Sequence, residues 1–408
     1  MTTDDAPLLG VDERDRRWDA LRSIMSGSDL DAVLVSGAGR DRWDRYLTGE
    51  ALGGFAFLAR TGQAVQLLGK FPLERFDATG KQIPRWVDDF RVGKLPGLLA
   101  ALLGERQLEG ARIGVVGLSS RSIGSHQGTI SFSLWSEVLA ACPGVEFVDI
   151  AEPFERLALV KSEDERRMVR HAASIGEAAC QAFVDACRIR VPESFPVAAA
   201  IAATVSRGGW LMDPTIIARS GPGSFAWSPA EWTHRGGGSR ILEQGDLVAA
   251  ELFSCYGGYE TQQQIHVSIG EPSADVRRLT DVVRAAQTVA LELLRPGVLF
   301  SEVTAQVRGV VLDAGYWSTG PVLQTVSPVM FNDGTHENMR ADPFLTDLPR
   351  FPDPVPPDGD FVIEAGVAFA VQPNAIHGGD RICLGGTVLI NDDGVEELNS
   401  IPTRLQVV

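Results

Sequence analysis

One short stretch of the sequence, GGYETQQQIHVSIG (residues 257–270), carries polar side chains at every second position. The stretch predicts a β-strand, and because strand side chains alternate between faces, Glu260, Gln262, Gln264 and His266 share one face. Carboxylates, amides and imidazoles can orient a small ligand, hold a cation or carry a proton. In an apolar part of the chain this row predicts a buried polar site, and a solvated strand is the alternative.

Aromatic and histidine side chains elsewhere add to the candidate site. Phe225 and Trp232 precede His234 in the chain and Tyr259 follows it. A mainly apolar pocket with a few polar groups is the usual form of a small-molecule site. His336, in DGTHENM, falls in a long irregular stretch, and loops carry function disproportionately. His377, in AIHGGDR, follows Gln372 and is a candidate for the rim of the pocket. Plain packing of the aromatic rings and solvent exposure of the histidines are the alternatives.

The bulk composition limits the classes of partner. The formal net charge of -16 argues against nucleic acid or an anionic membrane, since both need a basic face. No apolar run reaches the roughly 18 residues that span a bilayer. The five cysteines are dispersed without a CxxC pair, which is typical of reduced thiols in the cytoplasm. We therefore expect a cytoplasmic protein with a small-molecule substrate.

The first part of the chain alternates between strand-like and helix-like segments. The strands are predicted at residues 31–37, 53–69, 111–117 and 145–150, and the helices at 14–26, 95–107 and 133–144. Such alternation is typical of an α/β fold. We expect this N-terminal α/β domain to cover residues 1–155.

The second part has longer helices. Ser162 is a predicted N-cap with Glu165 three residues later, a capping-box pattern that opens a helix within residues 157–187. Further helices are predicted at residues 194–209, 273–297 and 299–316, and strands follow or separate them. This pattern predicts an α+β domain over residues 156–408, with helices packed on a curved antiparallel sheet.

Five phrases of this second part, in one order, resemble the pita-bread family, which includes creatinase, prolidase, aminopeptidase P and methionine aminopeptidase. They are LALVKSEDERRMVRHAASI, HRGGGSRILEQGDLVAAELFSCYGGYETQQQIHVSIGEP, LLRPGVLFSEVTAQVRGVVLDAGY, EAGVAFAVQPNA and GGTVLINDDGVEELN. The resemblance covers most of residues 157–408, and the N-terminal domain resembles that of the creatinase and prolidase branch. It implies the pita-bread fold and a homodimer.

In the metallopeptidase members of that family, two Asp, one His and two Glu residues hold two metal ions, which activate water. The resemblance places Glu251 and Gln262 at the Asp positions, and Gln372 and Gly385 at the Glu positions. A neutral amide is a poor ligand for a divalent ion on its own. With one carboxylate left, we expect no metal and no other cofactor.

The His position of the resemblance has two solutions. Counting forward from Pro296-Gly297 places it near Gln324, whereas counting back from Gly366 places it near His336. An insertion separates the two answers, and both stay open.

Creatinase keeps the fold and lacks the metal, and the resemblance gives His234 the role of acid and base. The carboxylates that orient its guanidinium substrate correspond to Gln264 and Gln372, so creatine itself is not expected. Glu251 is the second catalytic candidate, as a base, as a group that raises the basicity of His234, or as an ammonium ligand. Pairing of Glu251 with an arginine is the alternative. The predicted ligand-binding residues are Gln262, Gln264, Gln372, His266, Trp232, Phe225, Tyr259, Gln324, His336 and His377.

Three functions follow from this resemblance. The first is a metal-independent, creatinase-like hydrolase or lyase that acts on a small non-peptide molecule, by C–N hydrolysis or rearrangement, in specialised metabolism. The second is a catalytically inactive pita-bread binding protein. The third is a metallopeptidase with a rearranged site that uses Glu251, His336 and one other group. The first is the expectation.

Overall fold

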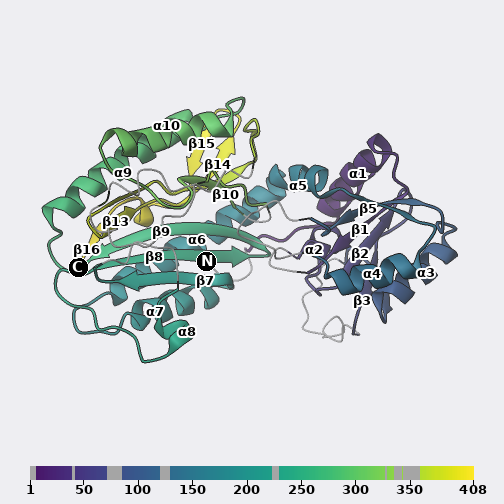
Figure 1. Ribbon diagram of the computed structural model, residues 1–408, viewed down its shortest axis with the longest axis horizontal. Helices are drawn as coiled ribbons and strands as arrows, with labels where there is room; N and C mark the ends of the chain where they lie inside the picture. The colour runs from purple at the N-terminus through teal and green to yellow at the C-terminus, as the bar shows by residue number, and fades with distance from the viewer. Residues whose placement is uncertain are drawn as a thin grey trace. The chain divides into compact units, whose positions relative to one another are not determined.

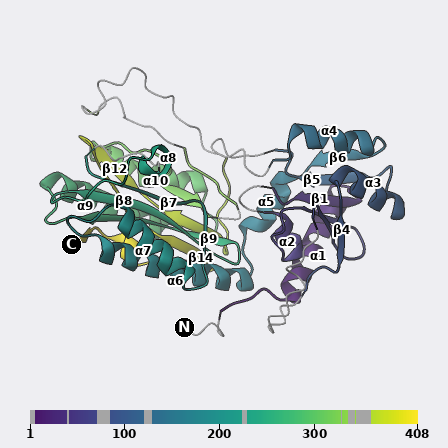
Figure 2. The ribbon, with the colours of Figure 1, turned by 90° about the horizontal axis from the view of Figure 1, so that it is seen from below.

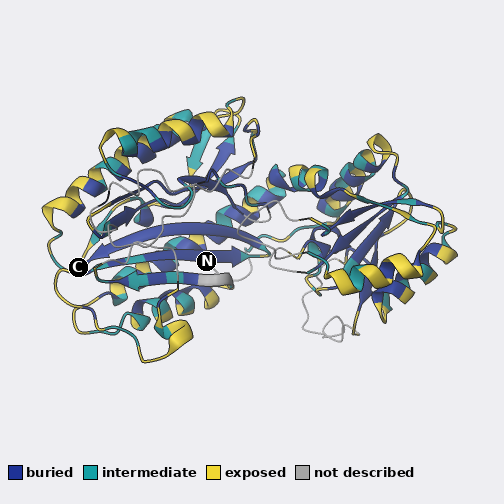
Figure 3. Cartoon of the chain, in the orientation of Figure 1, coloured by how far each residue is buried: buried dark blue, intermediate teal, exposed yellow. Residues whose placement is uncertain are grey.

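The structure, a computed structural model, describes residues 6–38, 42–70, 85–119, 129–222, 229–326, 329–334, 342 and 359–408 (Figure 1). The chain divides into two compact units, residues 8–158 and residues 159–408 together with 1–7. Each unit has its own hydrophobic core, and Figure 3 shows that the buried residues concentrate in the strands. None of the helices within these described ranges combines the length and apolarity needed to cross a membrane.

The unit of residues 8–158 has the α/β fold predicted for it. Its strands are β1 (Ala32–Ser36), β2 (Phe55–Ala59), β3 (Val65–Leu68), β4 (Asp89–Val92), β5 (Arg112–Val116) and β6 (Glu146–Asp149), in the sheet order β4-β3-β2-β1-β5-β6. Its helices are α1 (Val11–Gly27), α2 (Asp44–Thr48), α3 (Leu95–Glu105), α4 (Phe132–Ala141) and α5 (Ala151–Leu159). The continuous apolar run of β1 fits a strand that is buried on both faces and parallel to β5.

A buried carboxyl group stands at one edge of this sheet. Asp44, at the start of α2, accepts hydrogen bonds from Gln66 Nε2 at 3.0 Å and from the Gly53 N–H at 3.1 Å. A Cβ at Gly37 would lie 2.3 Å from the Asp44 carboxyl carbon, so the backbone approaches this side chain closely. Burial raises the pKa of Asp44 to about 6 although these hydrogen bonds oppose the shift.

The larger unit consists of two sheets, a hairpin and helices. One sheet has the order β16-β9-β8-β7 and the other the order β10-β11-β14-β15. The strands of the first sheet are β7 (Trp210–Ser220), β8 (Leu247–Tyr256), β9 (Tyr259–Ser268) and β16 (Gln406–Val407). Those of the second sheet are β10 (Leu323–Thr325), β11 (Ala368–Val371), β14 (Thr387–Asn391) and β15 (Gly394–Glu397), and the hairpin is β12 (Asn374–His377) and β13 (Asp380–Cys383). Because β16 runs parallel to β9, the first sheet is mixed rather than purely antiparallel as predicted.

The helices of this unit cover its sheets. They are α6 (Glu163–Ala186), α7 (Ser194–Val205), α8 (Trp232–Arg235), α9 (Ala274–Leu293) and α10 (Phe300–Asp313), and a short 3-10 helix, η5 (Ile401–Thr403), follows near the C-terminus. Figure 2 shows α6 and α7 along one face of the sheet β7-β8-β9, and α6 packs on both β8 and β9. The helices predicted from the sequence are therefore confirmed, apart from their exact ends.

The capping box predicted for α6 is present. Glu165 N–H donates to Ser162 Oγ at 3.2 Å, and the Ser162 N–H donates to Glu165 Oε2 at 2.8 Å. The second carboxylate oxygen of Glu165 accepts the Tyr259 hydroxyl at 2.8 Å. Glu165 therefore connects the first turn of α6 to the first residue of β9.

The face of β9 that meets α6 carries its own polar contact. Gln263 Nε2 donates to Thr261 Oγ1 at 3.1 Å and to Asn399 Oδ1 at 3.2 Å. A Cβ at Gly176 of α6 would lie 2.4 Å from the Gln263 amide carbon. Glycine at this position therefore makes room for the glutamine between helix and sheet.

Candidate functional site

The polar row predicted from the sequence lies on the face of the sheet opposite α6, here called the inner face. In the antiparallel pairing of β8 with β9, Glu251 stands opposite Gln264, and Ala249 stands opposite His266. Directly opposed residues share a face, so Glu251 joins the row of Gln262, Gln264 and His266. The alternative of a solvated strand is wrong, because every residue of β9 is buried.

Five buried side chains at the inner face form two hydrogen-bonded groups, here together called the amide network. Its members are Glu260, Gln262, Gln264, Gln324 and Gln372. Gln324 Nε2 donates to Gln262 Oε1, and Gln262 Nε2 donates to Glu260 Oε1 at 2.9 Å. Gln264 Nε2 donates to Gln372 Oε1 at 2.7 Å. The network therefore joins β9 to β10 and to the residue that follows β11.

His266 is held in one tautomer. Its Nδ1 donates to the Cys383 carbonyl oxygen at 2.8 Å, so the proton sits on Nδ1 and Nε2 keeps its lone pair. Burial, and next the positive charge of Arg381, lower the pKa of His266 to about 3. The ring is therefore neutral at physiological pH, and its Nε2 has no hydrogen-bond partner among the described residues.

A buried arginine, Arg381, interacts electrostatically with Glu251, and sequence reasoning missed it. Arg381 of β13 is 5% exposed and Glu251 is 6% exposed. Burial lowers the pKa of Arg381, whereas Cys383 and Glu251 act to raise it. The open alternative for Glu251, pairing with an arginine, agrees with this electrostatic attraction. The only sequence signal for Arg381 was a lone basic residue in the short apolar phrase DRICL.

Cys383 is a second residue that the sequence did not single out. Its Sγ donates to the Gln372 carbonyl oxygen at 3.5 Å. Burial raises the pKa of its thiol to about 12, so the sulfur is not a thiolate at neutral pH. Cys383 therefore adds a neutral group to the inner face.

Gly385 contributes only its backbone to the site. Its carbonyl oxygen accepts the Gln264 N–H at 2.8 Å, and its own N–H donates to the Gln264 carbonyl oxygen at 3.3 Å. A Cβ at this glycine, whose φ is +151°, would lie 1.7 Å from the Val371 carbonyl oxygen. No side chain fits at this position in the present backbone.

The other predicted site residues are dispersed. Tyr259 lies on the α6 side, where its hydroxyl is bonded to Glu165, and His377 is exposed at the end of β12 next to the Tyr316 ring. His234 is exposed in α8, where its Nδ1 lies 3.4 Å from Thr233 Oγ1. Phe225 and His336 lie outside the described residues. Of the two candidates for the His position, the structure thus brings Gln324 into the network.

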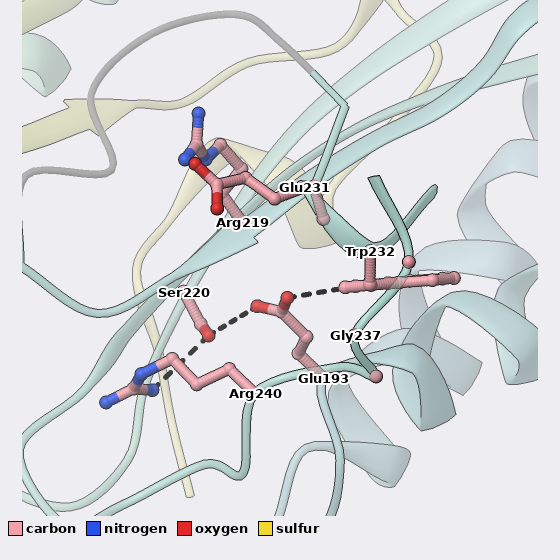
Figure 4. Close-up of a pocket in the computed structure, with 10 residues that line it drawn as sticks. Glu193, Arg219, Ser220, Glu231, Trp232, Gly237 and Arg240 are labelled. Atoms are coloured by element: carbon pink, nitrogen blue, oxygen red, sulfur yellow. Dashed lines mark hydrogen bonds between the residues drawn. The ribbon is translucent and has the colours of Figure 1, made fainter. Parts of the chain in front are cut away.

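A pocket of about 340 Å³ opens beside the end of β7 (Figure 4). It is lined by Glu193, Arg219, Ser220, Ala230, Glu231, Trp232, Gly236, Gly237, Gly238 and Arg240. Trp232 Nε1 and Ser220 Oγ donate to the two carboxylate oxygens of Glu193, at 2.9 and 2.6 Å. Trp232 was predicted as a ligand-binding residue, and among the predicted residues that the structure describes it alone lines this pocket.

Arg219 belongs both to the lining of the pocket and to the inner face of the sheet. In the pairing of β7 with β8, Arg219 stands opposite Ala249, which in turn stands opposite His266. These three residues therefore form one row on the same face, with strands about 4.8 Å apart. Arg219 and Ala249 are partly exposed while His266 is buried, so the row leads from the pocket into the sheet.

Comparison with known protein families identifies this architecture. The model of metallopeptidase family M24 matches residues 167–395. The chain belongs to metallopeptidase family M24. The pita-bread fold and the relationship to creatinase and prolidase that the sequence predicted are therefore confirmed.

Three proteins are similar to this M24 chain in sequence or in structure. The probable dipeptidase PepE of Mycobacterium bovis is 29% identical over 279 residues, and the Xaa-Pro dipeptidase of Lactobacillus helveticus is 23% identical over 268 residues. The first match spans 66% of each chain, and the second spans 65% of this chain and 67% of the relative. The X-Pro aminopeptidase of Thermotoga maritima has the same fold, with a TM-score of 0.73, 18% identity and coverage of 96% of this chain and 99% of that one.

These relatives overturn the expected function. The sequence led us to expect a metal-independent, creatinase-like enzyme with His234 as acid and base, acting on a small non-peptide molecule. That expectation is wrong, because the similar proteins are named dipeptidases and X-Pro peptidases. The substitution of carboxylates by amides indicated a change at the metal positions, but it carried no information about substrate class.

The residues of the inner face do not fit the metal that the family name implies. Within the described ranges, no group of three or more His, Cys, Asp and Glu side chains is placed to hold a metal ion. The oxygens of Gln262 and Gln372 already accept amide N–H groups, and Glu251 stands beside the cation of Arg381. No catalytic step is therefore assigned to a metal ion here.

Proposed function

We propose that this protein binds short peptides and that residues 159–408 are the part that binds them. The membership in family M24 carries this proposal, since the similar proteins are named for dipeptides and X-Pro peptides. A peptide bond offers one N–H donor and one C=O acceptor, and a glutamine side chain offers the same pair. The inner face is thus chemically suited to a peptide backbone.

The row of Arg219, Ala249 and His266 supplies groups for the rest of such a ligand. A guanidinium matches a carboxylate geometrically and electrostatically, so Arg219 suits the C-terminal carboxylate of a peptide. The neutral His266 offers an acceptor nitrogen for an N–H group. The small side chain of Ala249 leaves space between them. His234, next in the chain to the pocket-lining segment, is proposed as a residue of the rim.

Hydrolysis of the bound peptide is the second candidate function, and the family match favours it. Binding without hydrolysis is favoured by the amide network, which lacks the carboxylates that ligate catalytic metals. One experiment separates the two. A panel of dipeptides, with and without proline at the second position, is titrated by calorimetry while amine release is followed by mass spectrometry, in the presence and absence of Mn²⁺.

Saturable binding of at least one dipeptide class is expected. Replacing Arg219 by alanine should weaken that binding by about tenfold, which is about 1.4 kcal/mol. Arg235→Ala, which removes an exposed arginine of α8, is the matched control and should leave binding unchanged. Failure of every peptide to bind at millimolar concentration would remove the proposed function.

A further inference from the structure

At three of the positions where this family would hold metal ions, Gln262, Gln324 and Gln372, the side-chain amide is hydrogen-bonded to another glutamine. Gln324 donates to Gln262, and Gln264 donates to Gln372 at 2.7 Å. Each accepting amide oxygen is the atom that would have to face a cation. A cation at the site would therefore have to displace an amide N–H from Gln262 or Gln372, in a region where all four glutamines are at most 5% exposed.

The two described carboxylates of the inner face already interact with other side chains. Its described carboxylates are Glu251 and Glu260, and its described guanidiniums are Arg219 and Arg381. Glu260 receives the Gln262 amide at 2.9 Å, and Glu251 attracts the buried Arg381. Hard divalent cations select sites with several carboxylates, and a fixed guanidinium beside Glu251 opposes their entry electrostatically.

The last metal position has no room for a side chain. The Gly385 backbone is bonded to Gln264 on both sides, and a Cβ there would collide with the Val371 carbonyl oxygen. The path of the main chain therefore excludes a ligand side chain at residue 385. Cys383 Sγ is occupied as a donor to the Gln372 carbonyl oxygen.

We infer that the inner face of this M24 protein does not bind divalent metal ions, and that hydrogen bonds between neutral amides take their place, from Gln324 of β10 to Gln262 of β9 and from Gln264 of β9 to Gln372 after β11. This inference does not depend on the ligand being a peptide.

The native protein gives the first test. Protein purified without added metal is dialysed against Mn²⁺, Co²⁺ or Zn²⁺, its metal content is measured by mass spectrometry, and the titration is repeated by calorimetry. We expect no saturable site with a Kd below about 1 mM. Uptake of one or more ions per chain at a tighter Kd, lost in Gln262→Ala, would overturn the inference.

A gain-of-binding variant gives the second test. Gln262→Glu and Gln372→Glu, combined with Gln324→His, supply two carboxylates and an imidazole at the network positions. We expect this triple variant to bind Mn²⁺ at least about tenfold more tightly than the native protein. Gln263→Glu is the matched control, because Gln263 belongs to the same strand and is equally buried, but faces α6.

The outcomes of the second test are separable. Equal metal binding by the triple variant and by Gln263→Glu would show that any added carboxylate recruits metal, which would overturn the role given to the network. A triple variant that fails to fold, as judged by circular dichroism, leaves the decision with the native titration. Peptide binding by the native protein is measured independently, so failure of the proposed function and failure of this inference have different readouts.

Discussion

Removing the buried cation of the inner face should destabilise the protein strongly. Arg381 is 5% exposed and Glu251 is 6% exposed, so neither charge is solvated by bulk water. Replacing Arg381 by methionine keeps most of the side-chain volume and leaves Glu251 buried without that cation. Breaking a buried ion pair from one side costs about 3 to 5 kcal/mol. We expect a loss of that size in the free energy of unfolding.

A double-mutant cycle decides whether the two charges act as a pair. Glu251→Gln alone should also be costly, but the double variant Glu251→Gln, Arg381→Met should cost less than the sum by at least about 2 kcal/mol. Urea unfolding followed by circular dichroism gives the free energies, and hydrogen exchange in β9 and β13 shows whether the loss is local. Arg235→Met, at an exposed arginine, should change stability by less than about 0.5 kcal/mol. Additive effects of the two buried substitutions would refute the pairing.

Three further predictions concern stability. Since burial raises the pKa of Asp44 from 3.8 to about 6, the folded protein keeps this proton longer than the unfolded chain. The contribution of Asp44 to the free energy of unfolding is therefore fully present below about pH 4, and about 3 kcal/mol of it is lost as the pH rises through 6. Urea unfolding across this pH range should show the loss, and the Asp44→Asn variant should not show it. Gly385→Ala should cost about 3 kcal/mol or more in the same assay because of its collision with Val371, whereas Gly309→Ala, in open space on α10, should stabilise by about 0.5 to 1 kcal/mol. Ser162→Ala removes the cap of α6 and should cost about 1 kcal/mol, seen as a lower Tm by calorimetry; no change would mean that the capping box contributes nothing.

The local patterns of the sequence predicted the helices and the polar strand well. Alternation alone placed Gln262, Gln264 and His266 on one face of β9, because the period of a strand is fixed by its geometry. The capping box of Ser162 and Glu165 was equally predictable, since it involves two residues that are three apart in the sequence. Contacts between residues close in sequence are therefore found in the structure as the sequence predicted them.

Contacts between residues far apart in the chain could not be predicted in the same way. Arg381 and Glu251 are far apart in the chain, and nothing in the phrase DRICL shows that its arginine meets a buried carboxylate. The choice between Gln324 and His336 could not be made by counting residues, whereas the bond from Gln324 to Gln262 brings Gln324 into the network. The prediction of a non-peptide substrate was wrong because amides at the predicted metal positions carry no information about the class of ligand.

The close approach of Gly176 to Gln263 has a consequence for the evolution of this part of family M24. A glycine in the middle of α6 is costly by itself, and it is tolerated here because the glutamine occupies the space that a Cβ would take. The two positions should therefore change together among descendants of a common ancestor. Lineages in which residue 263 becomes small should be free to acquire alanine or serine at 176, and lineages that keep the glutamine should keep the glycine.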